Sequence, residues 1–510
     1  MGRTRRSMLV AVIAAALTVG VAGPAVAAGP SAVTGTAGAD GGPPAVPGDL
    51  KATEVSFRGD GGLAMNGTVL APAGAEKRRP GVVLVHGAGA GTPRTKLMGE
   101  AVEFARRGLA VLIYDKRSEG YSLFRRSYSQ LAGDALGALA ALRSQPGVDP
   151  SKVGVWGLSE GGWVAPMAAS RSADVAFVVL VGANSLQPLR QQAWAVAAGM
   201  RKAGVSGSLV DRAEPNLYRM LADGGMFPEP YYDPAPTLAA VRQPVLGIWG
   251  VHDLLTPPRE SPPGFAAAFR DGGNRRYTFR FFAGAEHAAH LTPDGGVTRL
   301  PELAPGYADL VGSWVREVTS GRPPADRMPG SGFVTSGPES VTSGGEPVTW
   351  GPEPVQETAT VPLEPPVWWE SARVQLAALV LFAVAFAAYP VVALVRRLRR
   401  RSGAPVSRAA RFLSASGPVV VLGSFAYLTY MVMTGAKLAA PGPLVAGRPV
   451  IWLVLQVLAV ACVVATARTA RAWARRPGSV PRGERVRLGL LLAGGVVLVP
   501  WGLYWGLLLP

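Results

Sequence analysis

The 510-residue sequence predicts two domains of different fold class, an α/β domain at residues 49–320 and an all-α transmembrane bundle at residues 367–510. In the first region, short β-branched runs alternate with helix-like segments, which is typical of a mostly parallel sheet with helices on both faces. The second region contains four apolar segments long enough to cross a bilayer. Overall, 48% of the residues are hydrophobic and 17% are charged, which is more apolar than one water-soluble domain requires.

Residues 1–28 have the pattern of a secretory signal peptide. Three arginines precede the apolar run 8–22, and Ala25-Val26-Ala27 supplies small residues at a cleavage site. The Arg5-Arg6 pair also resembles a twin-arginine signal, which leaves the export route open. Residues 29–48 are rich in Gly, Pro, Ala and Thr and predict a disordered tether.

The α/β domain is expected to begin with an antiparallel hairpin at 54–71. The strands expected after it are 81–85, 109–114, 153–156, 175–181, 245–249 and 277–282. Helices are expected between several of them, for example at 129–142 and 161–170. Residues 184–243 occupy the position of a lid over an active site and carry large apolar side chains that could line an acyl pocket.

Residues 321–366 are rich in Pro, Gly, Ser, Thr and Glu and contain few aliphatic residues. Such a segment cannot bury enough apolar surface to offset its chain entropy, so a disordered stalk is predicted. The transmembrane segments expected after the stalk are 374–395, 412–434, 450–467 and 488–509. None of the four contains a charged residue or a histidine, which argues against a transporter or pump.

The net charge of +17 is concentrated in a few short segments. The loops 396–411 and 468–487 hold seven arginines each, whereas the loop 435–449 between them holds only one lysine and one arginine. The positive-inside rule therefore places the first and third loops in the cytoplasm and the α/β domain outside it. This distribution excludes nucleic-acid binding as the leading interpretation.

Cys462 is the only cysteine, which excludes an internal disulfide, a thiolate metal site and a lipobox near the N-terminus. No metal-ligand spacing is present elsewhere, and no cofactor is expected.

Gly157-Leu158-Ser159-Glu160-Gly161 lies between an expected strand and an expected helix. A nucleophile elbow needs this context, because a sharp turn with small flanking residues presents the serine hydroxyl at the end of the sheet. The alternative is a glycine-rich structural turn. We predict that Ser159 is a nucleophile.

The loop His86-Gly87-Ala88-Gly89-Ala90-Gly91 also follows an expected strand. A phosphate-binding loop is the alternative, but the Gly-Lys-Ser/Thr ending of a P-loop is absent. The backbone N–H groups of Ala88 and Glu160 are expected to form an oxyanion hole, and His86 is expected to be structural.

A serine nucleophile needs a base, and the base needs an acid that orients it. Asp253 follows the strand 245–249, although an ordinary turn aspartate is the alternative. His287 follows the strand 277–282 and is the predicted base, with His290 as the alternative. The chain order Ser159, Asp253, His287 is that of α/β-hydrolases.

Residues 50–318 resemble the α/β-hydrolase superfamily, particularly its bacterial serine esterase and aminopeptidase-like branches. The resemblance is carried by His86-Gly87-Ala88-Gly89, Tyr114-Asp115-Lys116-Arg117, Gly120-Tyr121-Ser122, Gly157–Gly162 with Trp163, Gly250–Pro257 and Glu286-His287. It implies that Ser159 attacks an acyl carbonyl, that His287 relays the proton and that Asp253 holds His287. Ser118 and Glu119 depart from the Gly-rich pattern of the family. Asp115, Lys116 and Arg117 are interpreted as structural ion pairs that support the elbow.

The expected function is a membrane-anchored, extracytoplasmic serine hydrolase that cleaves an ester, thioester or amide of a small-molecule, lipid or peptide substrate. Two alternatives stay open, an acyltransferase that acts on an envelope acceptor and a non-catalytic binding module with a hydrolase fold. Four helices exceed what anchoring needs, so self-association through them, or contact with a partner, is a further expectation.

Overall fold

The computed structural model describes residues 46–74, 77–122, 124–321, 349–399, 407–434, 440–475 and 482–510. The predicted signal peptide and nearly all of the predicted tether lie outside these residues. The chain forms two compact units, which are described separately. The α/β unit contains the described residues 46–198 and 228–362, and the helical unit contains 199–227 and 363–510.

The α/β unit is built on one twisted sheet with the strand order β1-β2-β4-β3-β5-β6-β7-β8-β9. β1 and β2 pair antiparallel, β2 joins β4 antiparallel, and all later pairs are parallel. The predicted mostly parallel sheet and its leading hairpin are therefore confirmed. The strands are β1 (Leu50–Arg58), β2 (Ala64–Pro72), β3 (Arg79–Val85), β4 (Ala110–Tyr114), β5 (Val148–Leu158), β6 (Val178–Val181), β7 (Val245–Gly250), β8 (Tyr277–Phe282) and β9 (Thr349–Trp350).

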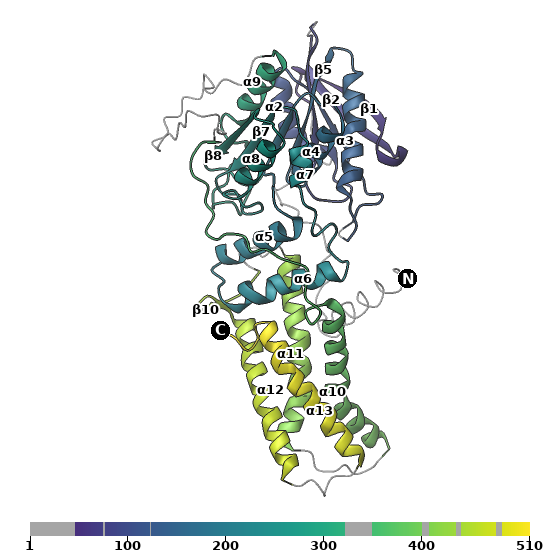
Figure 1. The fold of residues 1–510 in the computed structure, drawn as a ribbon, viewed down its shortest axis with the longest axis vertical. Coiled ribbons are helices and arrows are strands. Elements are labelled where there is room, and N and C mark those ends of the chain that lie inside the picture. Colours follow the sequence, from purple (N-terminus) through teal and green to yellow (C-terminus); the bar gives the residue numbers. More distant parts are fainter. Residues whose placement is uncertain are drawn as a thin grey trace. The chain divides into compact units, whose positions relative to one another are not determined.

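Helices cover both faces of this sheet (Figure 1), and each face has its own apolar core. One face is covered by α3 (Tyr128–Arg143), α4 (Gly161–Arg171), α7 (Ala235–Ala239) and α8 (Ser261–Asp271), and the other by α2 (Met98–Arg106) and α9 (Tyr307–Thr319). Short 3-10 turns lie at Asp60–Gly62 and Arg94–Leu97. The central strands are buried on both sides, because a parallel sheet connected by helices has no solvent-facing surface. This burial holds the carboxyl ends of the strands in fixed positions.

The segment expected to be a disordered stalk is structured from residue 349 onward. β9 extends the sheet beside β8, and residues 349–362, here called the strap, run along the loop that follows β7. Val355 donates its N–H to the carbonyl of Val251 at 2.8 Å. The carboxylate of Glu260 accepts hydrogen bonds from Gln356 and from both the N–H and the hydroxyl of Thr360. Hydrogen bonds to the rest of the α/β unit hold the strap in place, and the composition of the segment does not reveal these bonds. Residues 322–348 of the expected stalk lie outside the described residues.

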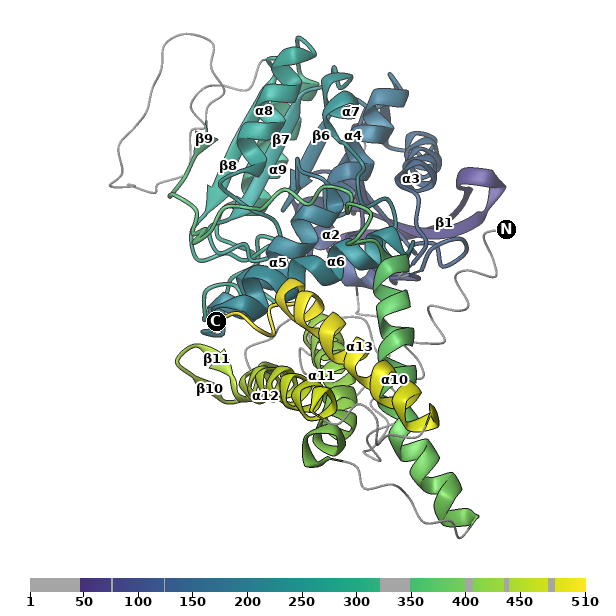
Figure 2. The same ribbon diagram turned by 60° about the horizontal axis from the view of Figure 1, so that its bottom comes forward.

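The helical unit contains α10 (Ala372–Leu398), α11 (Arg408–Met433), α12 (Val450–Ala474) and α13 (Arg482–Tyr504). α10 packs against α11 and α13, and α12 packs against the same two helices (Figure 2). All four are long and apolar enough to cross a membrane. A small hairpin of β10 (Leu444–Val445) and β11 (Arg448–Pro449) precedes α12. α13 begins before the expected segment 488–509, so it includes Glu484, whose buried carboxylate accepts the hydroxyl of Tyr389 and is paired with Arg487.

The predicted lid, residues 184–243, is divided between the two units. α5 (Pro188–Lys202) begins in the α/β unit and ends in the helical unit, which also contains the π-helical turn Leu209–Ala213 and α6 (Glu214–Asp223). Within the helical unit, Asn216 donates to the carbonyl of Tyr504 at 2.7 Å, and Asp223 accepts the N–H of Ala372 at 2.7 Å. Residues 199–227 are therefore bonded to the ends of α10 and α13.

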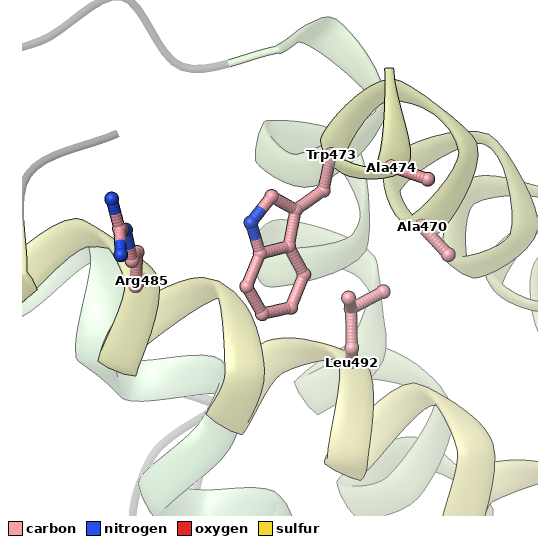
Figure 3. Close-up of a pocket in the computed structure, with 5 residues that line it drawn as sticks. All are labelled: Ala470, Trp473, Ala474, Arg485 and Leu492. Atoms are coloured by element: carbon pink, nitrogen blue, oxygen red, sulfur yellow. The ribbon is translucent and has the colours of Figure 1, made fainter. Parts of the chain in front are cut away.

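A cavity of about 350 Å³ in the helical unit is lined by Ala470, Trp473, Ala474, Arg485 and Leu492 (Figure 3). These residues belong to α12 and α13. None of them is a candidate site residue, so this cavity is separate from the chemistry considered below.

Candidate active site

Ser159 lies in a sharp turn between the end of β5 at Leu158 and the start of α4 at Gly161. Its φ of 56° is in the left-handed region, where a residue other than glycine is strained. Its N–H donates to the carbonyl of Val181 at 2.9 Å, which fixes the turn against β6. A Cβ at position 157 would lie only 2.1 Å from the carbonyl oxygen of Gly161, so glycine is required there. The turn has the form of a nucleophile elbow.

His287 and Asp253 are buried side by side at the carboxyl edge of the same sheet. Nδ1 of His287 lies 3.0 and 2.9 Å from Oδ1 and Oδ2 of Asp253. Asp253 is completely buried and also accepts the N–H groups of Leu255 and Thr256, each at 2.8 Å, and the hydroxyl of Thr256 at 2.5 Å. Because the carboxylate of Asp253 can only accept a hydrogen bond, the proton of the neutral imidazole lies on Nδ1. Nε2 of His287 is buried and has no hydrogen-bond partner among the described residues.

Gly182, the residue after β6, packs directly against His287, and no sequence motif marked it as part of the site. Its φ is 52°, and a Cβ there would lie 2.3 Å from the carbonyl oxygen and 2.7 Å from Nδ1 of His287. Because Ser159 bonds to Val181 and His287 packs on Gly182, one strand end positions both side chains. A glycine directly after the apolar run 178–181 was the available signal.

The loop after β3 also lies against the serine. A Cβ at Gly87 would lie 3.2 Å from the Cβ of Ser159. Nε2 of His86 lies 2.7 Å from the carbonyl oxygen of Tyr114, so the ring is bonded to the end of β4. Burial lowers the pKa of His86 to about 4, so the ring is neutral at pH 7 and donates its Nε2 proton. These contacts leave His86 with a structural role.

His290, the alternative base, has other partners. Nε2 of His290 lies 3.1 Å from the carboxylate of Glu100, and Nδ1 lies 3.0 Å from the carbonyl oxygen of Leu300. Both ring nitrogens are therefore occupied away from Asp253. The backbone N–H of His252 donates to the carbonyl of Ala285, in the loop after β8.

The three residues predicted to form structural ion pairs belong to three separate pairs. Arg117 pairs with Asp134 through two contacts of 2.6 Å, on the side of α3. Lys116 instead pairs with Glu160, the residue after Ser159, and Asp115 pairs with Arg94 near the surface. Glu160 also contacts Tyr121 and Arg126, and no sequence motif linked these two residues to the elbow. Among the described residues, no group of three or more His, Cys, Asp or Glu side chains could hold a metal ion.

Taken together, the strand order, the turn at Ser159 and the positions of Asp253 and His287 after later strands define an α/β-hydrolase fold. The fold predicted from the sequence is confirmed.

Comparisons with known proteins give partial matches. The chain is 32% identical over 139 residues to a polyketide transferase of Penicillium crustosum and 31% identical over 133 residues to a thiohydrolase of Aspergillus aculeatus. Each match covers 25% of this chain, and the chain spans only 43% and 41% of those two proteins. The crystal structure of 2,6-dihydroxy-pseudo-oxynicotine hydrolase is 16% identical, with a TM-score of 0.39, and the match covers 54% of this chain and 71% of that one. No family model matches the chain.

Proposed function

We propose that this protein is a serine hydrolase that cleaves an ester, thioester or amide through an acyl-enzyme on Ser159. The observation that carries the proposal is the buried His287–Asp253 pair, in which Nδ1 is bonded to the carboxylate and Nε2 has no partner in the described part of the chain. A structural histidine with that burial would normally bond both nitrogens, as His290 does.

In the proposed reaction, Ser159 Oγ transfers its proton to Nε2 of His287 as it attacks the acyl carbonyl. The N–H groups of Ala88 and Glu160 bind the oxygen of the tetrahedral intermediate. The imidazolium then protonates the leaving group as the scissile bond breaks. Water, deprotonated by His287, releases the acid and regenerates the serine. No cofactor takes part in this sequence.

Acyl transfer is the second candidate, because one partial relative is named a polyketide transferase. The other, named a thiohydrolase, is consistent with hydrolysis. Transfer would share the acyl-enzyme and replace water with an alcohol, thiol or amine acceptor. Measuring the ratio of free acid to acylated acceptor, with added glycerol or butanol as the acceptor, separates the two reactions.

The proposal is tested by fluorophosphonate labelling of membranes that contain the full chain. We expect labelling of the wild type and none of Ser159→Ala, with strongly reduced labelling of His287→Ala. Ser170→Ala is the matched control, because its hydroxyl lies on α4 and is already bonded to the carbonyl of Met167. Equal labelling of the wild type and Ser159→Ala would refute the assignment, and an unlabelled wild type would favour the binding-module alternative.

We further propose that the helical unit spans the membrane and that the α/β unit lies outside the cytoplasm. The four long apolar helices and the arginine-rich loops support this topology. In a Cys462→Ser background, an impermeant thiol reagent added to intact cells should label Lys437→Cys and leave Ser402→Cys unlabelled. Labelling of Ser402→Cys alone would reverse the orientation.

A further inference from the structure

Lys116 bonds to the loop after β3 and to the nucleophile turn at the same time. Its ammonium donates to the carbonyl of Gly87 at 2.6 Å and to the carboxylate of Glu160 at 2.5 Å. The side chains of Lys116 and Glu160 are only 4% and 1% exposed. A buried ion pair contributes little to stability on balance, because desolvation of the two charges offsets their attraction. The effect of this pair is to fix the position of the Gly87 carbonyl relative to Glu160.

The bond to Gly87 sets the direction of one predicted oxyanion donor. The carbonyl of Gly87 and the N–H of Ala88 belong to one planar peptide unit, and the described residues contain no cis peptide bond. In a trans peptide the two groups point in opposite directions. With Lys116 holding the carbonyl on one side, the N–H of Ala88 must point to the other. A Cβ at Gly87 would lie 3.2 Å from the Cβ of Ser159, so the peptide unit that carries this donor is close to the nucleophile.

The same ammonium holds the residue that supplies the second donor. Glu160 precedes α4, and its carboxylate is held by Lys116, by the hydroxyl of Tyr121 at 2.9 Å and by Arg126 at 2.7 Å. Burial raises the pKa of Glu160, but Lys116 and Arg126 outweigh that effect and leave it below the usual range. The carboxylate is therefore ionised and able to hold all three donors.

Tyr121 adds a second bond to the loop. Its hydroxyl accepts the N–H of Gly89 at 3.2 Å while it bonds to Glu160, and the Lys116 ammonium lies 4.4 Å from its ring centroid. The N–H groups of Ala88 and Glu160 themselves have no hydrogen-bond partner among the described residues. In the described part of the chain, both donors are therefore unpaired, and both belong to backbone segments that the Lys116–Glu160 ion pair holds.

We propose that Lys116 is a positioning residue of the oxyanion hole, and that the Lys116–Glu160 ion pair sets both oxyanion donors. This inference rests on the proposed serine hydrolase function. The ion pair touches neither the substrate nor the reacting atoms. It acts by fixing, before the reaction, the two donors that must meet the developing negative charge.

The experiment compares Lys116→Met with Arg117→Met in the full chain. Arg117 is the matched control, because it belongs to a neighbouring buried ion pair whose side chain bonds to Asp134 and the carbonyl of Asp60, away from the oxyanion loop. Turnover is measured with 4-nitrophenyl butyrate and with its thionoester, in which sulfur replaces the carbonyl oxygen. Sulfur accepts hydrogen bonds poorly, so the ester-to-thionoester ratio of kcat/KM reports on the oxyanion donors and is insensitive to a general loss of folded protein.

For Lys116→Met, we expect kcat for the ester to fall by about 10- to 100-fold with little change in KM. Deleting an oxyanion donor lowers kcat by ~10²–10³-fold, and a donor that is displaced but still present should lower kcat by less. The ester-to-thionoester ratio should fall at least tenfold. For Arg117→Met, the ratio should stay at the wild-type value even if the melting temperature falls.

The inference is wrong if Lys116→Met keeps the wild-type ester-to-thionoester ratio while its melting temperature falls as in Arg117→Met. The Lys116–Glu160 pair would then contribute to stability and not to the oxyanion donors. If Lys116→Met does not fold, Glu160→Gln keeps the shape of the side chain and removes its charge. The ratio should fall in that variant also, and a wild-type ratio there would overturn the inference. Wild-type protein that neither turns over the ester nor reacts with fluorophosphonate would instead refute the proposed function itself.

Discussion

Replacing Asp253 with asparagine tests whether this carboxylate sets the protonation of His287. In the structure, Oδ1 of Asp253 accepts the N–H groups of Leu255 and Thr256, and Oδ2 accepts the hydroxyl of Thr256. The N–H at Nδ1 of His287 is shared between the two oxygens, at 3.0 Å from Oδ1 and 2.9 Å from Oδ2. An asparagine can keep both backbone bonds through its oxygen. Its amide nitrogen must then occupy the place of Oδ2 and face Nδ1 as a donor.

The imidazole can satisfy an amide donor only by moving its own proton from Nδ1 to Nε2. A protonated Nε2 cannot accept the proton of Ser159, so the general base is lost while the packing is retained. We expect kcat/KM to fall by ~10⁴-fold at pH 7, the size of effect that the wrong tautomer causes in such triads. At 1.36 kcal/mol for each factor of ten, this is about 5.5 kcal/mol of transition-state stabilisation.

The assay is hydrolysis of 4-nitrophenyl butyrate by the purified full chain, with the melting temperature measured in parallel. Asp233→Asn is the matched control, because Asp233 also accepts the N–H two residues further on, from Ala235 at 3.0 Å, and is exposed. The control should retain wild-type kcat/KM. If Asp253→Asn retains more than a tenth of wild-type activity, Asp253 does not orient the base and the mechanism proposed here is wrong.

Two further predictions concern stability. Burial lowers the pKa of His86 from 6.5 to about 4. Between pH 6.5 and 4 the unfolded chain therefore binds a proton that the folded chain does not. As the pH falls through this range, His86 should lower the free energy of unfolding by about 3 kcal/mol. The melting temperature of His86→Gln should fall less over this range than that of the wild type, and parallel curves would contradict the prediction. Glu260→Ala should lower the melting temperature by several degrees, because charged hydrogen bonds contribute about 1.5–3 kcal/mol each and the strap loses its main acceptor. Glu357→Ala, an exposed glutamate of the strap, is the control, and equal melting temperatures for both variants would show that Glu260 does not hold the strap.

Local patterns predicted the elements that carry the site. The β-branched run before Gly157 and the small residues around Ser159 are sufficient to place a strand, a turn and a helix, because each depends on neighbours within a few residues. The expected strand 277–282 agrees with β8. The carboxyl ends of parallel strands share one edge of a sheet, so chain order alone suggested that Asp253 and His287 would lie near Ser159.

Contacts between distant parts of the chain were not predictable in the same way. A serine- and proline-rich segment gives no sign that Thr360 will bond to Glu260, one hundred residues earlier. Nor does the sequence between β6 and β7 show that residues 199–227 will belong to the helical unit. Both outcomes depend on polar groups that find partners only after the chain has folded.

The sequence by itself determined the fold class and the four apolar helices, and it identified Ser159 as the candidate nucleophile, because periodicity, segment length and short motifs are properties of adjacent residues. The tertiary structure decided which histidine meets Asp253 and which cation meets Glu160. His287 and His290 are three residues apart with similar surroundings in the sequence, yet their ring nitrogens bond to different elements. Lys116 and Arg117 are adjacent, yet they pair with carboxylates on different helices or turns. The reason is that consecutive side chains point in different directions, and only the packed elements determine what each one meets.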